Sequence, residues 1–205
     1  MASSHRIMIL GDSFPNRLRR FISSHESMNS QLNLSKEEIV WYTQGGLTLR
    51  KFHDFHEGQV RSLVRAVGPL SAAILCVGSN DMSKISPNDF IDLLMSQTVP
   101  LLYSLGCRII CVTKIFWRRE GDYTMDLDIK AYNKQVDSLN LKLSKLEFPL
   151  TFWNNNSVFK CGKVNNIWHK DGVHFDTVEQ LPYARSLRGA VIQCAENLNR
   201  YALMQ

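Results

Sequence analysis

The sequence of 205 residues lacks several features that would place it outside the ordinary globular proteins. No apolar run approaches the roughly 18 residues that a membrane-spanning helix needs. Glycine and proline are scarce, at 11 and 6 residues, and only 21% of residues are charged. Neither a collagen-like fibre nor a disordered tail is therefore expected. The length and the 44% hydrophobic share instead predict one compact domain over residues 1–205, which would bury about 70% of its unfolded surface.

The cysteine content and the start of the chain bear on the compartment. Five cysteines are an odd number, and Cys76, Cys107 and Cys111 stand in apolar runs where a free thiol behaves as a small hydrophobe. This usage favours a reducing environment over a disulfide framework. The first apolar run, 7–10, is too short for the core of a signal peptide and is not followed by a cleavage site. We therefore expect an intracellular, cytoplasmic location.

Apolar runs typical of strands alternate with longer stretches of helical periodicity. Strands are predicted at 5–10, 38–42, 72–77, 107–113 and 150–153. Helices are predicted at 14–25, 48–67, 126–146 and 177–201, with a further helix that begins after Ser86 and is kinked at Pro100. This order implies a three-layer α/β/α domain, in which helices cover both faces of a mostly parallel five-stranded sheet. Ligands of such sheets bind beyond the carboxyl ends of the strands.

Polar clusters stand at those strand ends and before the last helix. They are Gly11-Asp12-Ser13, Gly45-Gly46-Leu47-Thr48, Gly78-Ser79-Asn80-Asp81 and Asp171-Gly172-Val173-His174. The predicted topology brings all four to one edge of the sheet. A hydroxyl, an imidazole, a carboxylate and several hydrogen-bond donors are the groups that an acyl-transfer site needs.

Each cluster also has a purely structural interpretation. Ser13 opens a helix and is either a nucleophile or only an N-cap. Asp171 and His174 are three residues apart, so the carboxylate can reach Nδ1 of the imidazole. Alternatively, Asp171 caps the last helix and His174 is a partly exposed histidine. Asn80 and Gly46 offer donors, but both residue types are also common in turns.

Taken together, the clusters resemble the SGNH hydrolase superfamily, also called GDSL esterases and lipases. The matching segments, in family order, are Ile9-Leu10-Gly11-Asp12-Ser13, Gly45-Gly46-Leu47-Thr48, Gly78-Ser79-Asn80-Asp81 and Asp171-Gly172-Val173-His174-Phe175. The resemblance implies a flavodoxin-like fold, Ser13 as nucleophile, His174 as base and Asp171 as its partner. It also implies an oxyanion hole of the Ser13 N–H, the Gly46 N–H and the Asn80 side chain.

Two positions qualify the resemblance. Gly45 competes with Gly46 for the glycine role, but Gly46 stands two residues before Thr48 and fits the family spacing better. Phe14 replaces the smaller aliphatic residue of many members, a change that we expect to affect packing more than chemistry.

The activity implied is hydrolysis of small acyl esters of the acetyl type, in two steps and without a cofactor or metal. The sequence has neither the Gly-x-Ser-x-Gly elbow of ordinary α/β-hydrolases nor a Walker-type phosphate loop. Phe116 and Trp117 follow the fourth predicted strand, where they would wall the substrate pocket or merely anchor the loop. His53 and His56 have a spacing compatible with a metal, but without a third ligand we interpret them as part of a solvated helix face.

A second function remains open at this stage. The net charge is +5, and basic residues gather in the first third of the chain: Arg17, Arg19, Arg20, Arg50, Lys51, Arg61 and Arg65. Clustered positive charge suits nucleic acid or another anionic surface. The alternative is therefore a binding or assembly module on an SGNH scaffold, similar to domains of mobile-element proteins that handle nucleic acid. A solvated basic face is the simpler interpretation.

Overall fold

A single parallel sheet carries all the strands in the computed structural model, which describes residues 5–124, 127–155 and 167–204. The strands are β1 (Arg6–Gly11), β2 (Glu38–Thr43), β3 (Ala72–Cys76), β4 (Ile109–Thr113) and β5 (Leu150–Trp153). Their order across the sheet is β2-β1-β3-β4-β5, and every neighbouring pair is parallel. The predicted five-stranded α/β/α class is confirmed.

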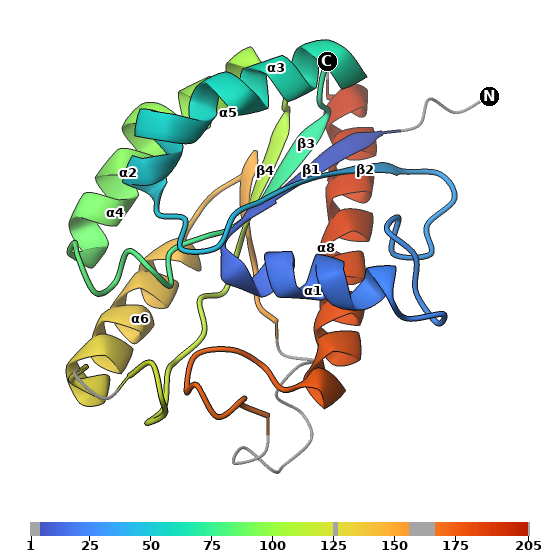
Figure 1. The fold of residues 1–205 in the computed structure, drawn as a ribbon. Helices are drawn as coiled ribbons and strands as arrows, with labels where there is room; N and C mark the ends of the chain where they lie inside the picture. The colour runs from blue at the N-terminus through green and yellow to red at the C-terminus, as the bar shows by residue number, and fades with distance from the viewer. Residues whose placement is uncertain (1–4, 125–126, 156–166, 205) are drawn as a thin grey trace.

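Helices cover both faces of this sheet (Figure 1). The segment between β2 and β3 consists of α2 (Leu49–Lys51), η1 (Phe52–His56) and α3 (Glu57–Val67), and the segment between β3 and β4 of α4 (Pro87–Leu93), η2 (Leu94–Thr98) and α5 (Val99–Ser104). These lie on one face together with α6 (Ile129–Leu143). The other face carries α1 (Ser13–Ser23) and α8 (Thr177–Leu203).

Alternate residues of each central strand supply the two hydrophobic cores. Met8 and Leu10 of β1 contact the cluster under α3, α5 and α6, whereas Ile7 and Ile9 contact the cluster under α1 and α8. All four side chains are fully buried. A strand that is buried on both faces has no polar side, which explains why these strands are continuous apolar runs in the sequence.

The helices differ from expectation in their details. The predicted helix 48–67 contains the π-helical turn η1, and the next helix contains the π-helical turn η2 directly before α5. Pro100 lies in the first turn of α5, where a helix tolerates its missing N–H. The π-helical turn η2, which is wider than an α-helical turn, therefore takes the place of the simple kink that we expected. Helix α6 begins at Ile129 rather than 126 because the Asp128 side chain caps it by accepting from the Ala131 N–H. Strand β4 begins at Ile109, two residues later than predicted.

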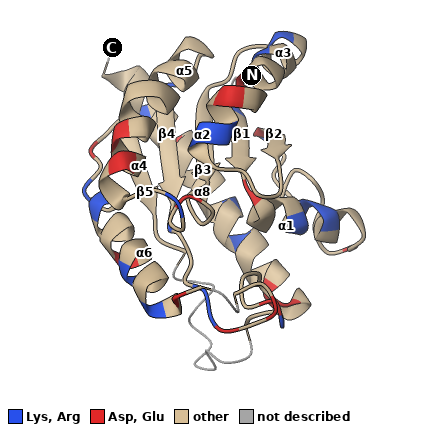
Figure 2. Ribbon diagram, turned by 60° about the vertical axis from the view of Figure 1, so that its left-hand side comes forward, with Lys and Arg blue, Asp and Glu red and all other residues tan. Residues whose placement is uncertain are grey.

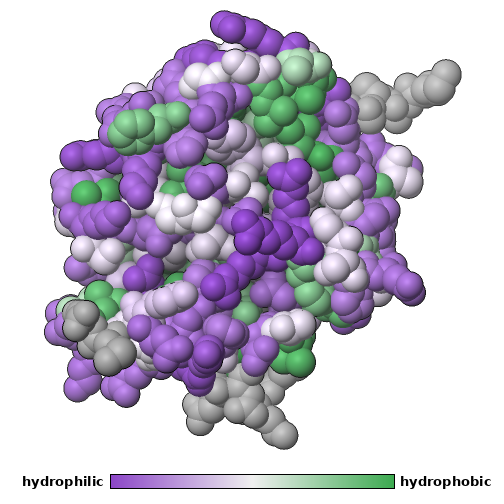
Figure 3. Space-filling model, in the orientation of Figure 1, coloured by the Kyte–Doolittle hydropathy of each residue, from purple (hydrophilic) through white to green (hydrophobic). Residues whose placement is uncertain are grey.

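The surface in the view of Figure 3 is largely hydrophilic, with hydrophobic side chains in small groups. Basic residues are spread over several helices, including α1, α2 and α3, rather than gathered along one groove (Figure 2). No helix within residues 5–124, 127–155 and 167–204 is long and apolar enough to cross a membrane.

Candidate active site

The topology places two of the polar loops side by side. Strand β1 lies between β2 and β3, so the chain leaves β1 toward one side of the sheet and later returns to the other. Loops diverge at such a switch point and leave a crevice at the carboxyl ends of the strands. Ser13 lies two residues after the end of β1 and Asn80 four residues after the end of β3, which brings both to this crevice.

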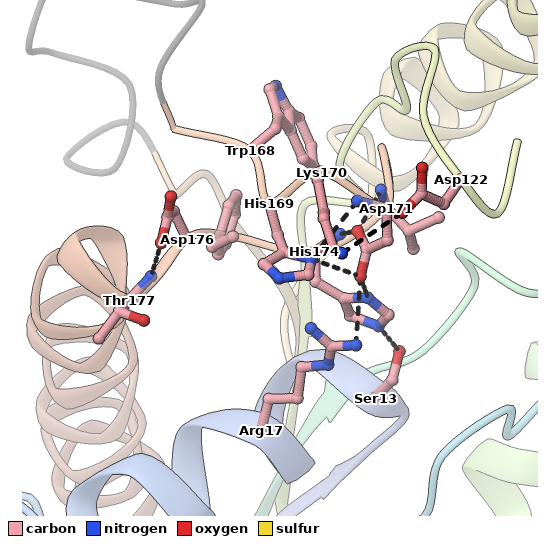
Figure 4. A network of polar contacts seen from close by, with 12 residues as sticks. Ser13, Arg17, Asp122, Trp168, His169, Lys170, Asp171, His174, Asp176 and Thr177 are labelled. Atoms are coloured by element: carbon pink, nitrogen blue, oxygen red, sulfur yellow. Dashed lines mark hydrogen bonds and ion pairs between the residues drawn. The ribbon is translucent and has the colours of Figure 1, made fainter.

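Three side chains form a continuous hydrogen-bonded chain there (Figure 4). Ser13 Oγ lies 2.7 Å from His174 Nε2, and His174 Nδ1 lies 2.8 Å from Asp171 Oδ2. An ionised carboxylate only accepts hydrogen bonds, so Nδ1 carries the proton and Nε2 is left to accept from the serine hydroxyl. The imidazole is therefore held in the tautomer that a general base requires.

The capping interpretation of Ser13 and Asp171 is contradicted by the helix N-termini. Helix α1 is capped by Asp12, whose Oδ1 accepts from the Phe14 N–H at 3.0 Å. Helix α8 is capped by Asp176, not by Asp171. Ser13 and Asp171 are thus not the side chains that cap these helices, and both point toward His174 (Figure 4).

Asp171 is buried and makes several contacts. Its Oδ1 accepts from the backbone N–H groups of Val173 and His174, each at 2.9 Å, which fixes the turn between Asp171 and His174. Its Oδ2 faces His174 and also lies 3.2 Å from Arg17 Nη2 and 3.2 Å from His169 Nδ1. Arg17 lies one turn after Ser13 on α1, so the Ser13 hydroxyl and this guanidinium share a helix face.

Burial and hydrogen bonding set the ionisation of the pair. Burial raises the pKa of Asp171, but the hydrogen bonds from the backbone of His174 and Val173 and from the His174 side chain outweigh it and hold the pKa well below its usual range. Burial lowers the pKa of His174; the Asp171 hydrogen bond opposes this, while the charges of Arg17 and Arg118 lower the pKa further. The lowered pKa favours the neutral imidazole, which is the form that a general base requires.

A second buried carboxyl, that of Asp12, stabilises the loop before Ser13. Besides capping α1, Asp12 accepts a hydrogen bond from Ser79 Oγ at 2.7 Å through Oδ2, which connects the loops after β1 and β3. Burial raises the pKa of Asp12 to about 6, although the Ser79 and Phe14 hydrogen bonds act against it.

The loops after β2 and β3 are joined by two further contacts. Asn80 Nδ2 donates to the Leu47 carbonyl at 3.2 Å, and Asp81 Oδ1 accepts from the Leu49 N–H at 3.0 Å. Gly46 is exposed and adopts a positive φ of 70°, a conformation that favours glycine. A Cβ at Gly46 would have no neighbour within 4 Å, so this backbone is open to a ligand.

No protein-family model matches the sequence, and no curated protein is significantly similar to it. Several solved structures, in contrast, are similar in fold to this chain. A protein from Slackia heliotrinireducens assigned by inference to the SGNH hydrolases is 15% identical over 90% of this chain and 97% of its own, with a TM-score of 0.66.

Two further similar structures are of enzymes whose names refer to acetyl groups. The C-terminal catalytic domain of Streptococcus pneumoniae peptidoglycan O-acetyltransferase A is 16% identical over 95% of this chain and 97% of its own, with a TM-score of 0.60. An acetyl esterase is also 16% identical, over 95% of this chain and 99% of its own, with a TM-score of 0.59. The chain has the fold of the SGNH hydrolases. At these identities the likeness establishes the fold alone.

The SGNH fold places Phe116 and Trp117 in different surroundings. Phe116 is buried, and its ring centroid lies 5.2 Å from that of Phe14 and 4.7 Å from that of Phe175. The Phe14 ring in turn lies 5.5 Å from the His174 imidazole, so Phe116 belongs to the aromatic layer that packs behind His174. Trp117 is 51% exposed and donates from Nε1 to Asp137 of α6 at 2.8 Å.

The histidine pair of η1 is not the solvated face that we expected. The His53 side chain is only 10% exposed, and its Nε2 lies 2.9 Å from Thr98 Oγ1 of η2. His56 Nδ1 lies 2.9 Å from the Tyr42 hydroxyl. Both imidazoles are thus used in contacts between secondary-structure elements. In the described part of the chain, no group of three or more histidine, cysteine or acidic residues could hold a metal ion.

Sequence reasoning missed two arginines at the site. In the sequence Arg17 stands out only as part of a basic region, but its position four residues after Ser13 on a predicted helix is a signal that the two share a helix face. Arg118 donates from Nη2 to the Ser79 carbonyl at 2.9 Å and to Asn80 Oδ1 at 3.4 Å. Nothing in the sequence near Arg118 indicates this long-range contact.

Proposed function

We propose that this protein is a serine esterase that hydrolyses small acyl esters of the acetyl type. The observation that carries the proposal is the unbroken chain from Ser13 Oγ through His174 to Asp171, with hydrogen bonds of 2.7 and 2.8 Å. A serine placed at a helix N-terminus, beside a neutral imidazole that a buried carboxylate orients, is suited to nucleophilic attack on an ester carbonyl.

The first half-reaction forms an acyl-enzyme. His174 Nε2 takes the Ser13 proton while Oγ attacks the carbonyl carbon, and the carbonyl oxygen becomes negatively charged. The Ser13 N–H, the Gly46 N–H and Asn80 Nδ2 are the proposed donors to this oxyanion, and the N-terminus of α1 adds its dipole. As the tetrahedral intermediate collapses, the carbon–oxygen bond to the alcohol breaks and His174 gives the proton to the departing alcohol.

The second half-reaction repeats these roles with water. His174 accepts a proton from the attacking water, the same donors hold the second oxyanion, and collapse returns the proton to Ser13 Oγ as the carboxylic acid leaves. Each oxyanion donor typically accounts for about 100- to 1,000-fold in rate. Asp171 keeps the imidazole oriented and stabilises it when it is protonated.

One observation favours a short acyl group. The acetyl esterase and the O-acetyltransferase that share this fold are both named for acetyl chemistry.

The test is covalent labelling of the folded protein with a fluorophosphonate, which reacts with activated serines. We expect an adduct on the peptide that contains Ser13 and none in the Ser13→Ala variant. Absence of that adduct from correctly folded protein would reject the esterase proposal and leave the non-catalytic binding module as the better interpretation.

A further inference from the structure

An asparagine that serves as an oxyanion donor must present the correct end of its amide. The oxygen and the NH₂ group have nearly the same shape, so packing alone does not select between the two orientations. Only hydrogen-bond partners with a fixed role can do so. Asn80 has two such partners, one at each end of its amide.

The two partners of Asn80 favour the same orientation. At one end Nδ2 donates to the Leu47 carbonyl, which can only accept. At the other end Oδ1 accepts from Arg118 Nη2, which can only donate. A flipped amide would place oxygen against oxygen at Leu47 and nitrogen against nitrogen at Arg118. In the observed orientation Nδ2 uses one hydrogen on Leu47 and keeps the second for a ligand.

Arg118 is itself held firmly. Its guanidinium lies 4.5 Å from the ring centroid of Tyr132, which is buried on α6, and donates to the Ser79 carbonyl at 2.9 Å. The Tyr132 hydroxyl donates to the same carbonyl at 2.8 Å. The Arg118 backbone is paired on both sides with the Asn133 side chain, through two hydrogen bonds of 2.9 Å. The guanidinium is therefore connected rigidly to the loop that carries Asn80.

The charge of Arg118 is not neutralised by direct contact. Among the residues that the structure describes, no carboxylate forms an ion pair with this guanidinium, and its buried Nε has no hydrogen-bond partner. A permanent positive charge thus lies against the oxygen of Asn80. It polarises the amide and makes Nδ2 a better donor to a developing negative charge.

We propose that Arg118 is a positioning residue, which sets the orientation of the Asn80 amide and strengthens it as an oxyanion donor. The proposal rests on the esterase function for its kinetic consequences, but not for the orientation itself. It adds to the site a residue from the β4–α6 loop that none of the matching sequence segments contains.

The kinetic test compares Arg118→Met, Arg118→Lys and Asn80→Ala on p-nitrophenyl acetate, with Arg61→Met as the matched control. Arg61 pairs with Glu57 on α3 and contacts none of the site residues described above. For Arg118→Met we expect kcat to fall about 10- to 100-fold with little change in KM, since an oxyanion donor acts mainly in the transition state. Arg118→Lys should recover part of this loss, and Arg118→Met combined with Asn80→Ala should be no slower than Asn80→Ala alone.

A kcat of folded Arg118→Met within twofold of the wild type, or losses that multiply in the double variant, would overturn the proposal. If Arg118→Met does not fold, the same comparison is made with Arg118→Lys. A second readout, by NMR, does not depend on activity. It follows the side-chain amide resonances of Asn80 in ¹⁵N-labelled protein, which are assigned by their loss in Asn80→Ala. They should shift and exchange faster with water in the Arg118 variants and stay unchanged in Arg61→Met. If the wild type is inactive, the esterase proposal fails, but a shift of the Asn80 resonances in the Arg118 variants would still support the positioning role. Unchanged resonances in an inactive protein would reject both proposals.

Discussion

Replacing Asp171 separates its structural role from its catalytic role, because its two oxygens have different partners. Oδ1 accepts from two backbone N–H groups, of Val173 and His174, and Oδ2 accepts from His174 Nδ1. Asp171→Asn can keep an oxygen toward the backbone but places an NH₂ group against the imidazole. Asp171→Ala removes both sets of contacts.

The stability of the two variants should differ accordingly. In Asp171→Ala two N–H groups of a buried turn lose their acceptor, and each such loss costs about 1–3 kcal/mol. We therefore expect the free energy of unfolding to fall by roughly 2–6 kcal/mol. Asp171→Asn loses mainly the contact with Arg17, whose side chain is 37% exposed and whose ion pair contributes about 1 kcal/mol at most.

The kcat values of the variants should not follow the order of their stabilities. The amide nitrogen of Asp171→Asn forces His174 Nδ1 to become the acceptor, so the proton moves to Nε2, which can then no longer take the proton of Ser13. In serine hydrolases this wrong tautomer lowers kcat about 10⁴-fold, and loss of the histidine itself costs about 10⁶-fold. His174→Ala should thus approach Ser13→Ala, while Asp171→Asn keeps about 100 times more activity.

The measurements are kcat on p-nitrophenyl acetate and thermal unfolding, made on the same preparations of Ser13→Ala, His174→Ala, Asp171→Asn and Asp171→Ala. The serine and histidine losses should not multiply in a double variant, because both residues act in one proton transfer. If these side chains served only the fold, melting temperatures would drop with little loss of rate per folded molecule. Near-wild-type kcat in folded His174→Ala would refute the triad.

Three further predictions concern pH and substrate. The charge of Arg17 lowers the pKa of His174, so Arg17→Met should move the acid limb of the kcat/KM profile to higher pH, and a limb that stays in place would contradict this. Burial raises the pKa of Asp12 from 3.8 to about 6, so the folded state binds this proton more tightly and the contribution of Asp12 to stability falls as pH rises from 4 to 7. That loss, about 2 kcal/mol, should be missing in Asp12→Asn when urea unfolding is compared at pH 4 and 7. Finally, p-nitrophenyl acetate should be hydrolysed faster than long-chain esters, and a rate that increases steadily toward palmitate would be evidence against the small-acyl assignment.

The strands were predictable because their burial leaves a direct trace in the sequence. Positions 72–76 are buried on both faces, and only an uninterrupted apolar run satisfies that environment. The first residues of the helices were less predictable than the strands. Ser86 and Pro87 gave a correct start for α4, where Ser86 and Asp89 form a capping box. For α1 the residue beside the nucleophile, Asp12, proved to be the cap.

The residues that escaped prediction act across the fold rather than along the chain. The π-helical turns η1 and η2 meet through His53 and Thr98, and no local pattern in either segment shows that the other will lie beside it. The same holds for Arg118, which reaches Asn80 only because β3 and β4 are neighbours in the sheet. A motif therefore identifies the groups that carry out the chemistry, whereas the residues that orient those groups become visible only when the sheet order is known.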